Sequence, residues 1–421
     1  MKKSDIPKGY KPTAVGVIPE DWEVKTLGQA FDFISGYAFS SNQFNSNGLK
    51  LITPKNFTKN GSASFEKNNT KYTAEEVDRK YYCKEGDLLI LLTDLTPTCE
   101  LLGKPALLTK KDGTVLLNQR IVKLNPKRNL NPRFVNNFLL TDSPHKWIKR
   151  TATGSTVKHS SNNSLSNIKI PLPPLPEQQK IAAILSNWDL ALEQCEAAIS
   201  TLKKRNKGLA QQLLSGQKRL DGFEGEWQEY QFGDLIKEVK RPIEWDDEEL
   251  YQLISVRRRS GGLFKRDSLY GKEIKTKNLR TAKKDDFLIS KMQIVHGAAG
   301  LVTEEFDDMK ISGSYIAVRS KTDKILDIRY LNWLSKLPRF YHQTYTSSFG
   351  VHIEKMTFSF KLFLKEKIHL PKHEEQQAIV NILQQADREL ELQIAKRDAL
   401  QEQKKGLMQK LLTGEVRVSL K

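Results

Sequence analysis

The sequence predicts an α+β protein in which two mixed α/β domains are separated by two long antiparallel coiled-coil helices, with a pseudo-twofold internal repeat. A 50-residue segment occurs twice, each copy carries a heptad pattern, and the segment before each copy alternates short β-rich runs with turn residues. We expect a first variable domain (1–172), a first shared helix (173–216), a second variable domain (217–370) and a second shared helix (371–415).

The repeat is carried by the two shared segments. Ile170–Arg219 aligns with Ile368–Arg417 without a gap, and 22 of the 50 positions are identical. The variable domains match only at scattered points, such as Trp22 in PEDWEVKTLG and Trp227 in EGEWQEYQFG. The same frame is therefore used twice to carry two different domains.

Each shared segment reads as one long helix. A proline-rich start around Pro173 and Pro176 permits helix initiation, and no proline follows before Gly216, a good helix end. At 1.5 Å per residue, about 38 residues give a helix of about 57 Å. Apolar residues alternate by four and three, as in a coiled-coil seam, with Asn206 and Lys404 at equivalent seam positions. Two interpretations stay open: these polar residues fix the register of the helix pair, or Asn206 lies at a frayed edge.

The variable domains carry the strand signals. Candidate strands in the first are Leu49–Thr53, Asp87–Leu92, Pro105–Leu108, Gln119–Leu124 and Asn167–Leu172. One helix is predicted at Asn131–Leu140 and its counterpart in the second domain at Arg329–Leu337. Each domain therefore reads as a twisted sheet with a helix.

The net charge of +18 suggests a polyanionic partner, although a solubility charge alone could account for the total. Residues 1–170 hold 26 Lys and Arg against 15 Asp and Glu, and residues 217–368 hold 28 against 23. The shared segments are nearly neutral. The positive excess therefore belongs to the variable domains.

Loops between the predicted strands supply candidate DNA contacts. Arg, Lys, Asn and Gln match base edges, while Ser, Thr and Lys commonly hold phosphates. A single loop Lys is usually a solvated charge, but three adjacent arginines repel one another unless an anion is present. The candidates are Lys55, Asn56, Lys59, Thr153, Ser155, Thr156 and Lys158 in the first domain, and Arg257, Arg258, Arg259, Lys265, Lys291, Gln293, His296, Ser347, Ser348, His352 and Lys355 in the second.

No catalytic or cofactor motif stands out. The chain lacks a GxxxxGK[ST] phosphate loop, a GxGxxG fingerprint, an HExxH pair, an amino-methyltransferase Asn/Asp-Pro-Pro-aromatic motif and a nuclease pattern. Cys83, Cys99 and Cys195 have no metal-ligand spacing, and neither a membrane segment nor a signal peptide is recognisable. We expect a cytoplasmic protein that is not an enzyme.

The paired segments PLPPLPEQQKIAAIL…NKGLAQQLLSG and LPKHEEQQAIVNIL…KKGLMQKLLTG resemble the two conserved regions of type I restriction–modification specificity subunits. The starts IPEDWEVKTLG and FEGEWQEYQFG resemble the starts of their two target-recognition domains, and TGSTVKHSSNNSLSNIKIPLP resembles the end of one. The resemblance covers essentially the whole chain. The second domain departs from it, with TSSFGVHIEKM in place of a clear TGST.

The resemblance implies that each recognition domain reads one half of a bipartite site in double-stranded DNA and that the helices set the spacer. It implies two methyltransferase (modification) subunits that carry S-adenosylmethionine, and restriction/translocase subunits that use ATP and Mg²⁺ in the full complex, with no cofactor or metal on this chain. Helix packing and partner docking would fall to Glu177, Gln178, Gln179, Leu185, Leu192, Leu202, Asn206, Glu375, Gln376, Gln377, Leu383, Leu390, Leu400 and Lys404.

Two other hypotheses remain. A stand-alone nucleic-acid-binding regulator or scaffold on a coiled-coil frame would bind without methyltransferase partners. An enzyme with an unrecognised active site would show turnover alone. The repeat favours the specificity subunit over both.

Overall fold

Each shared segment forms one continuous helix. The computed structural model describes residues 6–45, 47–94, 98–155 and 157–420, in which α5 covers Leu175–Leu214 and α10 covers His373–Thr413. Gly216 and Gly414 follow the two helices with φ of 72° and 75°, the left-handed conformation that ends a helix. The two predicted long helices are therefore confirmed.

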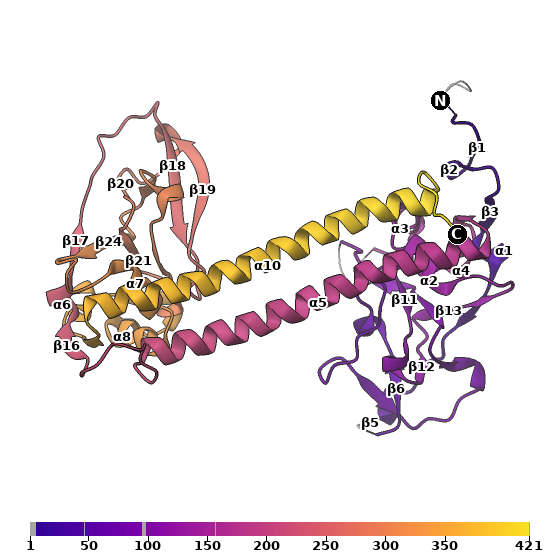
Figure 1. Cartoon of the computed structure of the whole chain (residues 1–421), viewed down its shortest axis with the longest axis horizontal. Coiled ribbons are helices and arrows are strands. Elements are labelled where there is room, and N and C mark those ends of the chain that lie inside the picture. Colours follow the sequence, from indigo (N-terminus) through magenta and orange to yellow (C-terminus); the bar gives the residue numbers. More distant parts are fainter. Residues whose placement is uncertain (1–5, 46, 95–97, 156, 421) are drawn as a thin grey trace. The chain divides into compact units, whose positions relative to one another are not determined.

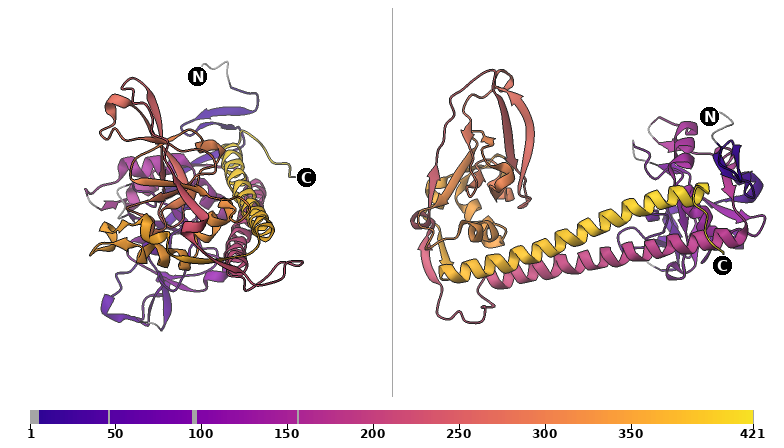
Figure 2. Two further views of the ribbon diagram at one scale, coloured as in Figure 1. Left: turned by 90° about the vertical axis from the view of Figure 1, so that its left-hand side faces the viewer. Right: turned by 45° about the horizontal axis from the view of Figure 1, so that its top comes forward.

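The chain divides into two compact units, and each unit contains one variable domain with part of both long helices. Unit 1 comprises residues 1–196 and 396–421, and unit 2 comprises residues 197–395. Within each unit the two helices lie side by side (Figures 1 and 2). The division into four segments that the sequence suggests is a different description of the chain, and it stays a prediction.

The heptad seam is confirmed along both helices. Every predicted seam position, from Ile181 to Leu213 in α5 and from Ile379 to Leu411 in α10, is buried or half-buried. The helices run antiparallel within each unit, as their contacts show: Glu177 with Arg417 and Asp189 with Lys404 in unit 1, and Arg219 with Glu375 and Asn206 with Ala386 in unit 2.

Unit 1 contains two main sheets. The first is antiparallel, in the order β11-β9-β13-β4, and the second has the order β5-β7-β6-β12-β8, with β12 parallel to β6. The strands are β11 (Pro105–Leu107), β9 (Leu88–Leu91), β13 (Ile121–Pro126), β4 (Phe31–Ser35), β5 (Phe44–Asn45), β7 (Lys71–Thr73), β6 (Leu49–Ile52), β12 (Val115–Leu117) and β8 (Tyr82–Cys83). Small ladders join β1 (Tyr10–Thr13) to β2 (Gly16–Pro19), β3 (Glu23–Thr26) to β15 (Lys169–Leu172) and β10 (Thr93–Asp94) to β14 (Lys158–His159). All five predicted strands are present, with shifts of one or two residues at their ends.

Unit 2 has a related plan with longer strands. One antiparallel sheet has the order β17-β24-β21-β22, and the other has the order β19-β18-β23-β20, in which β18 and β19 form a long hairpin (Figure 1). The strands are β17 (Ile236–Val239), β24 (Tyr315–Ser320), β21 (Phe287–Ser290), β22 (Ala299–Leu301), β19 (Leu263–Tyr270), β18 (Leu250–Val256), β23 (Lys310–Ile311) and β20 (Arg280–Thr281). Two further ladders join β16 (Gln228–Gln231) to β27 (Lys367–Leu370) and β25 (Ser348–Phe349) to β26 (Thr357–Phe358).

Both variable domains carry a pair of helices where the sequence predicted one. The predicted helices are confirmed as α2 (Pro132–Leu139) and α7 (Ile328–Leu334), and Asn131 and Asp327 cap their first turns with side-chain oxygens. The second helix of each pair was not predicted: α3 (Asp142–Thr151) and α8 (Pro338–Thr346). One-turn helices complete the set: α1 (Leu27–Ala30), α4 (Asn162–Ser166), α6 (Phe232–Leu235) and α9 (Phe360–Phe363).

The core of each unit joins its variable domain to the long helices. In unit 1, Trp22, Phe134 and other buried residues of the domain form one cluster with Ile181 and Leu185 of α5 and Leu411 of α10. An equivalent cluster in unit 2 includes Leu213 of α5 and Leu383 of α10. The helix ends are therefore part of the domain cores. Within the described part of the chain, no helix combines the length and the apolar composition that crossing a membrane requires.

Candidate nucleic-acid interface

Three loops of the second variable domain come together in unit 2. They are the Arg257–Gly262 turn between β18 and β19, the Lys291–Gly297 loop after β21, and the β25–β26 hairpin with its tip at residues 350–356. Backbone hydrogen bonds join them, from Arg259 N to His296 O (2.6 Å), from Ser260 N to Gly297 O (2.9 Å) and from Phe358 N to Lys291 O (2.9 Å). The structure thus gathers most of the candidates predicted in this domain.

The Arg257–Gly262 turn holds a strained backbone. Arg259 and Ser260 have φ of 58° and 53°, a conformation that costs a residue other than glycine about 1–2 kcal/mol. The hydroxyls of Ser260 and Tyr341 lie 2.7 Å apart, and the Arg257 guanidinium stacks over Phe264 at 4.5 Å. Such strain persists only where the surroundings fix it, which is typical of recognition loops.

Glu354 ties the arginine turn to the hairpin tip. Arg258 donates to both carboxylate oxygens of Glu354, at 3.3 and 2.7 Å, and His296 Nε2 lies 3.3 Å from the same carboxylate. The Arg258 hydrogen bond, opposed in part by desolvation, lowers the pKa of Glu354 below its usual value. Arg258 therefore already has an anionic partner that a phosphate or a base edge would have to replace.

The other candidates in this domain differ in exposure. Lys265, His352 and Lys355 are exposed, whereas Lys291 is half-buried and donates to Gly313 O at 2.8 Å. Gln293 is half-buried, and among the residues that the structure describes its Oε1 has no hydrogen-bond partner. Ser347 and Ser348 are buried, and Ser348 Oγ donates to Thr344 O at 2.7 Å. Their position corrects the expectation of phosphate contact, because these hydroxyls lie inside the domain.

In the first domain the candidates lie on two separate loops. Lys55 and Lys59 are exposed, and Lys59 forms an ion pair with Glu100 that lowers the pKa of that carboxyl. Asn56 is fully buried: its amide donates to Ser64 O at 3.0 Å and its Oδ1 caps the turn that starts at Thr53. Its burial corrects the expected base contact, since the amide is used within the domain.

The second loop of the first domain leads into β14, where Thr153 pairs with His159 and β14 itself pairs with β10. Thr153 and Ser155 are exposed and Lys158 is half-buried, while Thr156 lies outside the described residues. Asp94 of β10 lies opposite Lys158, and its side chain accepts hydrogen bonds from the backbone N–H groups of Leu101 (2.8 Å) and Leu102 (3.2 Å).

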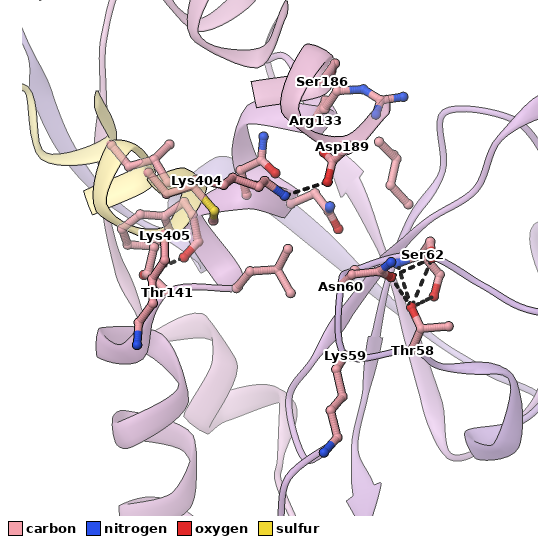
Figure 3. Close-up of a pocket in the computed structure, with 18 of the residues that line it drawn as sticks. Thr58, Lys59, Asn60, Ser62, Arg133, Thr141, Ser186, Asp189, Lys404 and Lys405 are labelled. Carbon is pink, nitrogen blue, oxygen red and sulfur yellow. Dashed lines mark hydrogen bonds and ion pairs between the residues drawn. The ribbon is translucent and has the colours of Figure 1, made fainter. Parts of the chain in front are cut away.

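A groove of about 1970 Å³ opens in unit 1 between the Thr58–Ser64 loop, α2, α3 and the two long helices (Figure 3). Side chains of both signs line it. Among the basic ones are Arg133, Lys146 and Arg150, which the sequence did not single out, although KWIKR in α3 was a visible signal. Thr58, Asn60 and Ser62 are hydrogen-bonded to one another on one wall, and Lys404 faces Asp189 on the other (Figure 3).

The repeated EQQ sequence anchors each helix to its own domain. Glu177 is buried and accepts two hydrogen bonds from Arg417, at 2.8 and 2.9 Å, and one from Trp22 Nε1 at 3.0 Å. Glu375 is buried against Arg219 at 2.7 and 2.8 Å. The hydrogen bond to Glu375 raises the pKa of Arg219. The hydrogen bonds to Glu177 and to the exposed Asp21 raise the pKa of Arg417.

Gln178 and Gln376 complete these anchors. Each donates to the backbone at the helix start, to Pro173 O (2.8 Å) and to Pro371 O (3.0 Å) respectively. Each also accepts from the backbone N–H of the residue that caps the domain helix, Asn131 or Asp327, at 3.0 Å. Of the EQQ residues only Gln179 and Gln377 are exposed, so only these two are accessible to a partner.

The polar seam residues are paired across the helices. Asn206 is buried and its Nδ2 donates to Ala386 O at 2.7 Å, so it does not lie at a frayed edge. Lys404 is buried and donates to Asp189 at 2.5 Å. The predicted packing leucines are buried (Leu185 and Leu383) or half-buried (Leu192, Leu202, Leu390 and Leu400). No cluster of His, Cys, Asp and Glu suited to a metal ion occurs among the described residues.

Comparison with known proteins gives one consistent result. The type I restriction modification DNA specificity domain matches residues 19–203 and again residues 224–402. The chain is 24% identical to the putative type I restriction enzyme MjaX specificity subunit of Methanocaldococcus jannaschii, over 98% of this chain and 97% of that protein. It is 25% identical to the MjaVIII specificity subunit of the same organism, over 95% and 94%.

The fold matches a solved structure along nearly its whole length. The crystal structure of the type I restriction–modification S subunit from M. genitalium superposes with a TM-score of 0.58 at 17% identity, over 93% of this chain and 96% of that one.

Proposed function

Because the chain belongs to the family of type I restriction–modification DNA specificity subunits, we propose that its two variable domains each read one half of a bipartite DNA site. Specificity subunits of these systems are non-catalytic proteins that recognise DNA sequence. The two matches to the specificity domain carry the proposal, because one chain then holds two separate readers.

The second domain supports this proposal with its three joined loops. Arg258, Arg259, Lys265, His352 and Lys355 are exposed on or beside these loops. Arginine and lysine at such positions pair with guanine edges and phosphates. The strained turn and its backbone hydrogen bonds hold the loops in one conformation, which lowers the entropy lost on binding.

The long helices support the proposed spacer role. Their 40 and 41 residues correspond to about 60 Å of helix each. The hydrogen bonds of Glu177 and Glu375 join the start of each helix to a domain core. A change in helix length should therefore change the distance between the two recognition domains.

Two methyltransferase subunits are the partners that we propose, and restriction/translocase subunits would join them in the full complex. S-adenosylmethionine, ATP and Mg²⁺ would reside on those partners. Gln179, Gln377 and the exposed Lys207 and Lys405 are among the accessible repeated side chains on the helices, and the groove in unit 1 adds a concave surface.

Methylation mapping tests the proposal. DNA is sequenced for modified bases from cells that express this chain with and without the methyltransferase encoded beside it. A split motif of N6-methyladenine that requires both proteins is the expected result. No motif in the presence of a soluble methyltransferase would refute it and would favour a stand-alone nucleic-acid binder.

A further inference from the structure

The β25–β26 hairpin exposes three large apolar side chains, one at the end of β25 and two in its tip. Phe349 is 62% exposed, Val351 is 96% exposed and Ile353 is 48% exposed. Apolar side chains gathered at a projecting loop usually mark a binding surface. These three side chains therefore form a candidate binding surface.

The exposed side chains belong to a hairpin that is packed against the core of unit 2. Met356, the last residue of the tip, and Phe358 of β26 are buried in the core of unit 2 with Phe340 and Phe363. Gly350 has φ of 153°, and a Cβ at this position would lie 2.9 Å from Met356 Cα. The two strands approach each other closely there. One side of the hairpin is thus fixed in the core, and the apolar tip residues remain outside it.

Basic side chains surround this tip. His352 and Lys355 belong to the tip itself, Arg258 and His296 contact its Glu354, and Lys291 hydrogen-bonds to β26 through its backbone. Glu354 is the one acidic residue of the segment 347–359 and is already neutralised by Arg258. An apolar tip within a basic surface is complementary to a polyanion that also offers apolar groups, and DNA offers the thymine methyl.

We propose that the β25–β26 ribbon enters the major groove and that Phe349 and Val351 contact the C5-methyl groups of thymine. The inference rests on the proposed function and deepens it, because it names a base that the second domain reads. The major groove admits a two-stranded ribbon, and the thymine methyl is the apolar feature on its floor. Arg258 and Lys355 then lie where they can hold the flanking phosphates or a guanine edge.

The first domain provides a contrast. The corresponding sequence there is TGSTVK, in which Thr153 and Ser155 are exposed. These hydroxyls can donate and accept hydrogen bonds, whereas Phe349 and Val351 can only make apolar contacts. Sensitivity to the thymine methyl is therefore assigned to the half-site of the second domain.

The experiment uses the full chain in complex with its methyltransferase subunits and duplexes that carry the mapped site. Each thymine is replaced in turn by deoxyuridine, which removes the methyl group and keeps the base pair. For the wild-type chain, one or two such replacements within one half-site should weaken binding about fourfold each, the effect of one methyl group returned to water. Val351→Ala or Phe349→Ala should weaken binding to the thymine duplex and lose the sensitivity to deoxyuridine.

Leu250→Ala is the matched control. Leu250 is also an exposed apolar residue of unit 2, but it pairs with Tyr270 at the opposite end of the β18–β19 hairpin from the Arg257–Gly262 turn. At about 3.3 Å per residue it is roughly 20 Å from that turn. This variant should bind like the wild type and keep its sensitivity to deoxyuridine.

Three results would overturn the inference while the proposed function stands: a second-domain half-site without thymine, wild-type binding that ignores every deoxyuridine, or tip variants that bind DNA normally and instead lose the methyltransferase subunits. The last would make the tip a protein-docking surface. Failure of the wild-type complex to prefer the mapped duplex over an unrelated one would refute the proposed function, and this inference with it.

Discussion

The two helix anchors make a comparative prediction within one molecule. Arg219→Ala removes the partner of Glu375, and Arg417→Ala removes the partner of Glu177, and both carboxylates are 1% exposed. Glu177 keeps the hydrogen bond from Trp22 Nε1 at 3.0 Å. The corresponding Trp227 Nε1 has no hydrogen-bond partner, and within the described chain Arg219 is the side chain that donates to Glu375. Arg219→Ala should therefore destabilise its unit more.

The magnitudes follow from burial. Leaving a buried carboxylate without its partner costs about 3–5 kcal/mol, and water can replace part of this where the removed arginine is partly exposed. The Arg219 side chain is 29% exposed and the Arg417 side chain is 41% exposed. We expect losses of about 3 kcal/mol for Arg219→Ala and about 2 kcal/mol for Arg417→Ala. The exposed Asp21–Arg417 pair adds little, as surface ion pairs do.

Hydrogen exchange followed by mass spectrometry measures each loss locally, from the opening free energies of peptides at the starts of α5 and α10. Adding Glu375→Gln to Arg219→Ala should restore part of the loss, because the buried charge is removed. Equal losses in the two units, or a larger loss for Arg417→Ala, would refute this reasoning.

The remaining predictions concern binding, spacing and chemical reactivity. Arg258→Ala should weaken DNA binding about tenfold at ~0.1 M salt and reduce the salt dependence by about one phosphate contact. Lys277→Ala, which removes an exposed ion pair with Asp247 on another loop, should leave the affinity for DNA unchanged. Unchanged affinity for Arg258→Ala would show that the arginine turn is not part of the interface. One heptad inserted after Glu196 and another after Ala395, where the two units divide, adds about 10.5 Å to each helix. The unread spacer between the half-sites should then lengthen by about 3 base pairs, and the bases that are read should stay the same. An unchanged spacer in the methylation map would contradict the spacer role of the helices. Burial raises the pKa of Cys83 to about 12, so at pH 8 its thiol should resist iodoacetamide in the folded protein and react once urea unfolds it. Equal labelling of native and unfolded protein would instead show that the thiol is accessible in the fold. The raised pKa of Cys83 also makes the free energy of unfolding depend on pH: its contribution is complete below the pKa of the unfolded thiol, near 8.5, and should be lost as the pH rises toward 12.

The long helices were predictable because their signal is repeated and local. A heptad pattern without proline specifies a helix and its buried face, and the second copy reinforces the first. The Asn131-Pro132 pair likewise located α2, since the side chain caps the helix and proline suits its first turn. By contrast, α3 and α8 lack such a start signal, because Thr141 and Leu337, which precede them, make no capping hydrogen bond with their side chains.

Side-chain burial in loops was not predictable, because it depends on contacts distant in sequence. Asn56, Ser347 and Ser348 have the composition of surface loops, yet tertiary packing places them inside. Glu177 and Gln178 looked like a polar docking patch, but Arg417 and Asn131, far away in the chain, use these side chains as anchors. The convergence of three loops around Arg258 and Glu354 has the same origin.

Exchange of residues 1–170 for the corresponding domain of another family member, followed by methylation mapping, tests the central claim most directly. The account predicts that one half of the methylated motif changes while the other half and the spacer remain. A motif that changes in both halves, or in neither, would contradict the assignment of one reader to each variable domain.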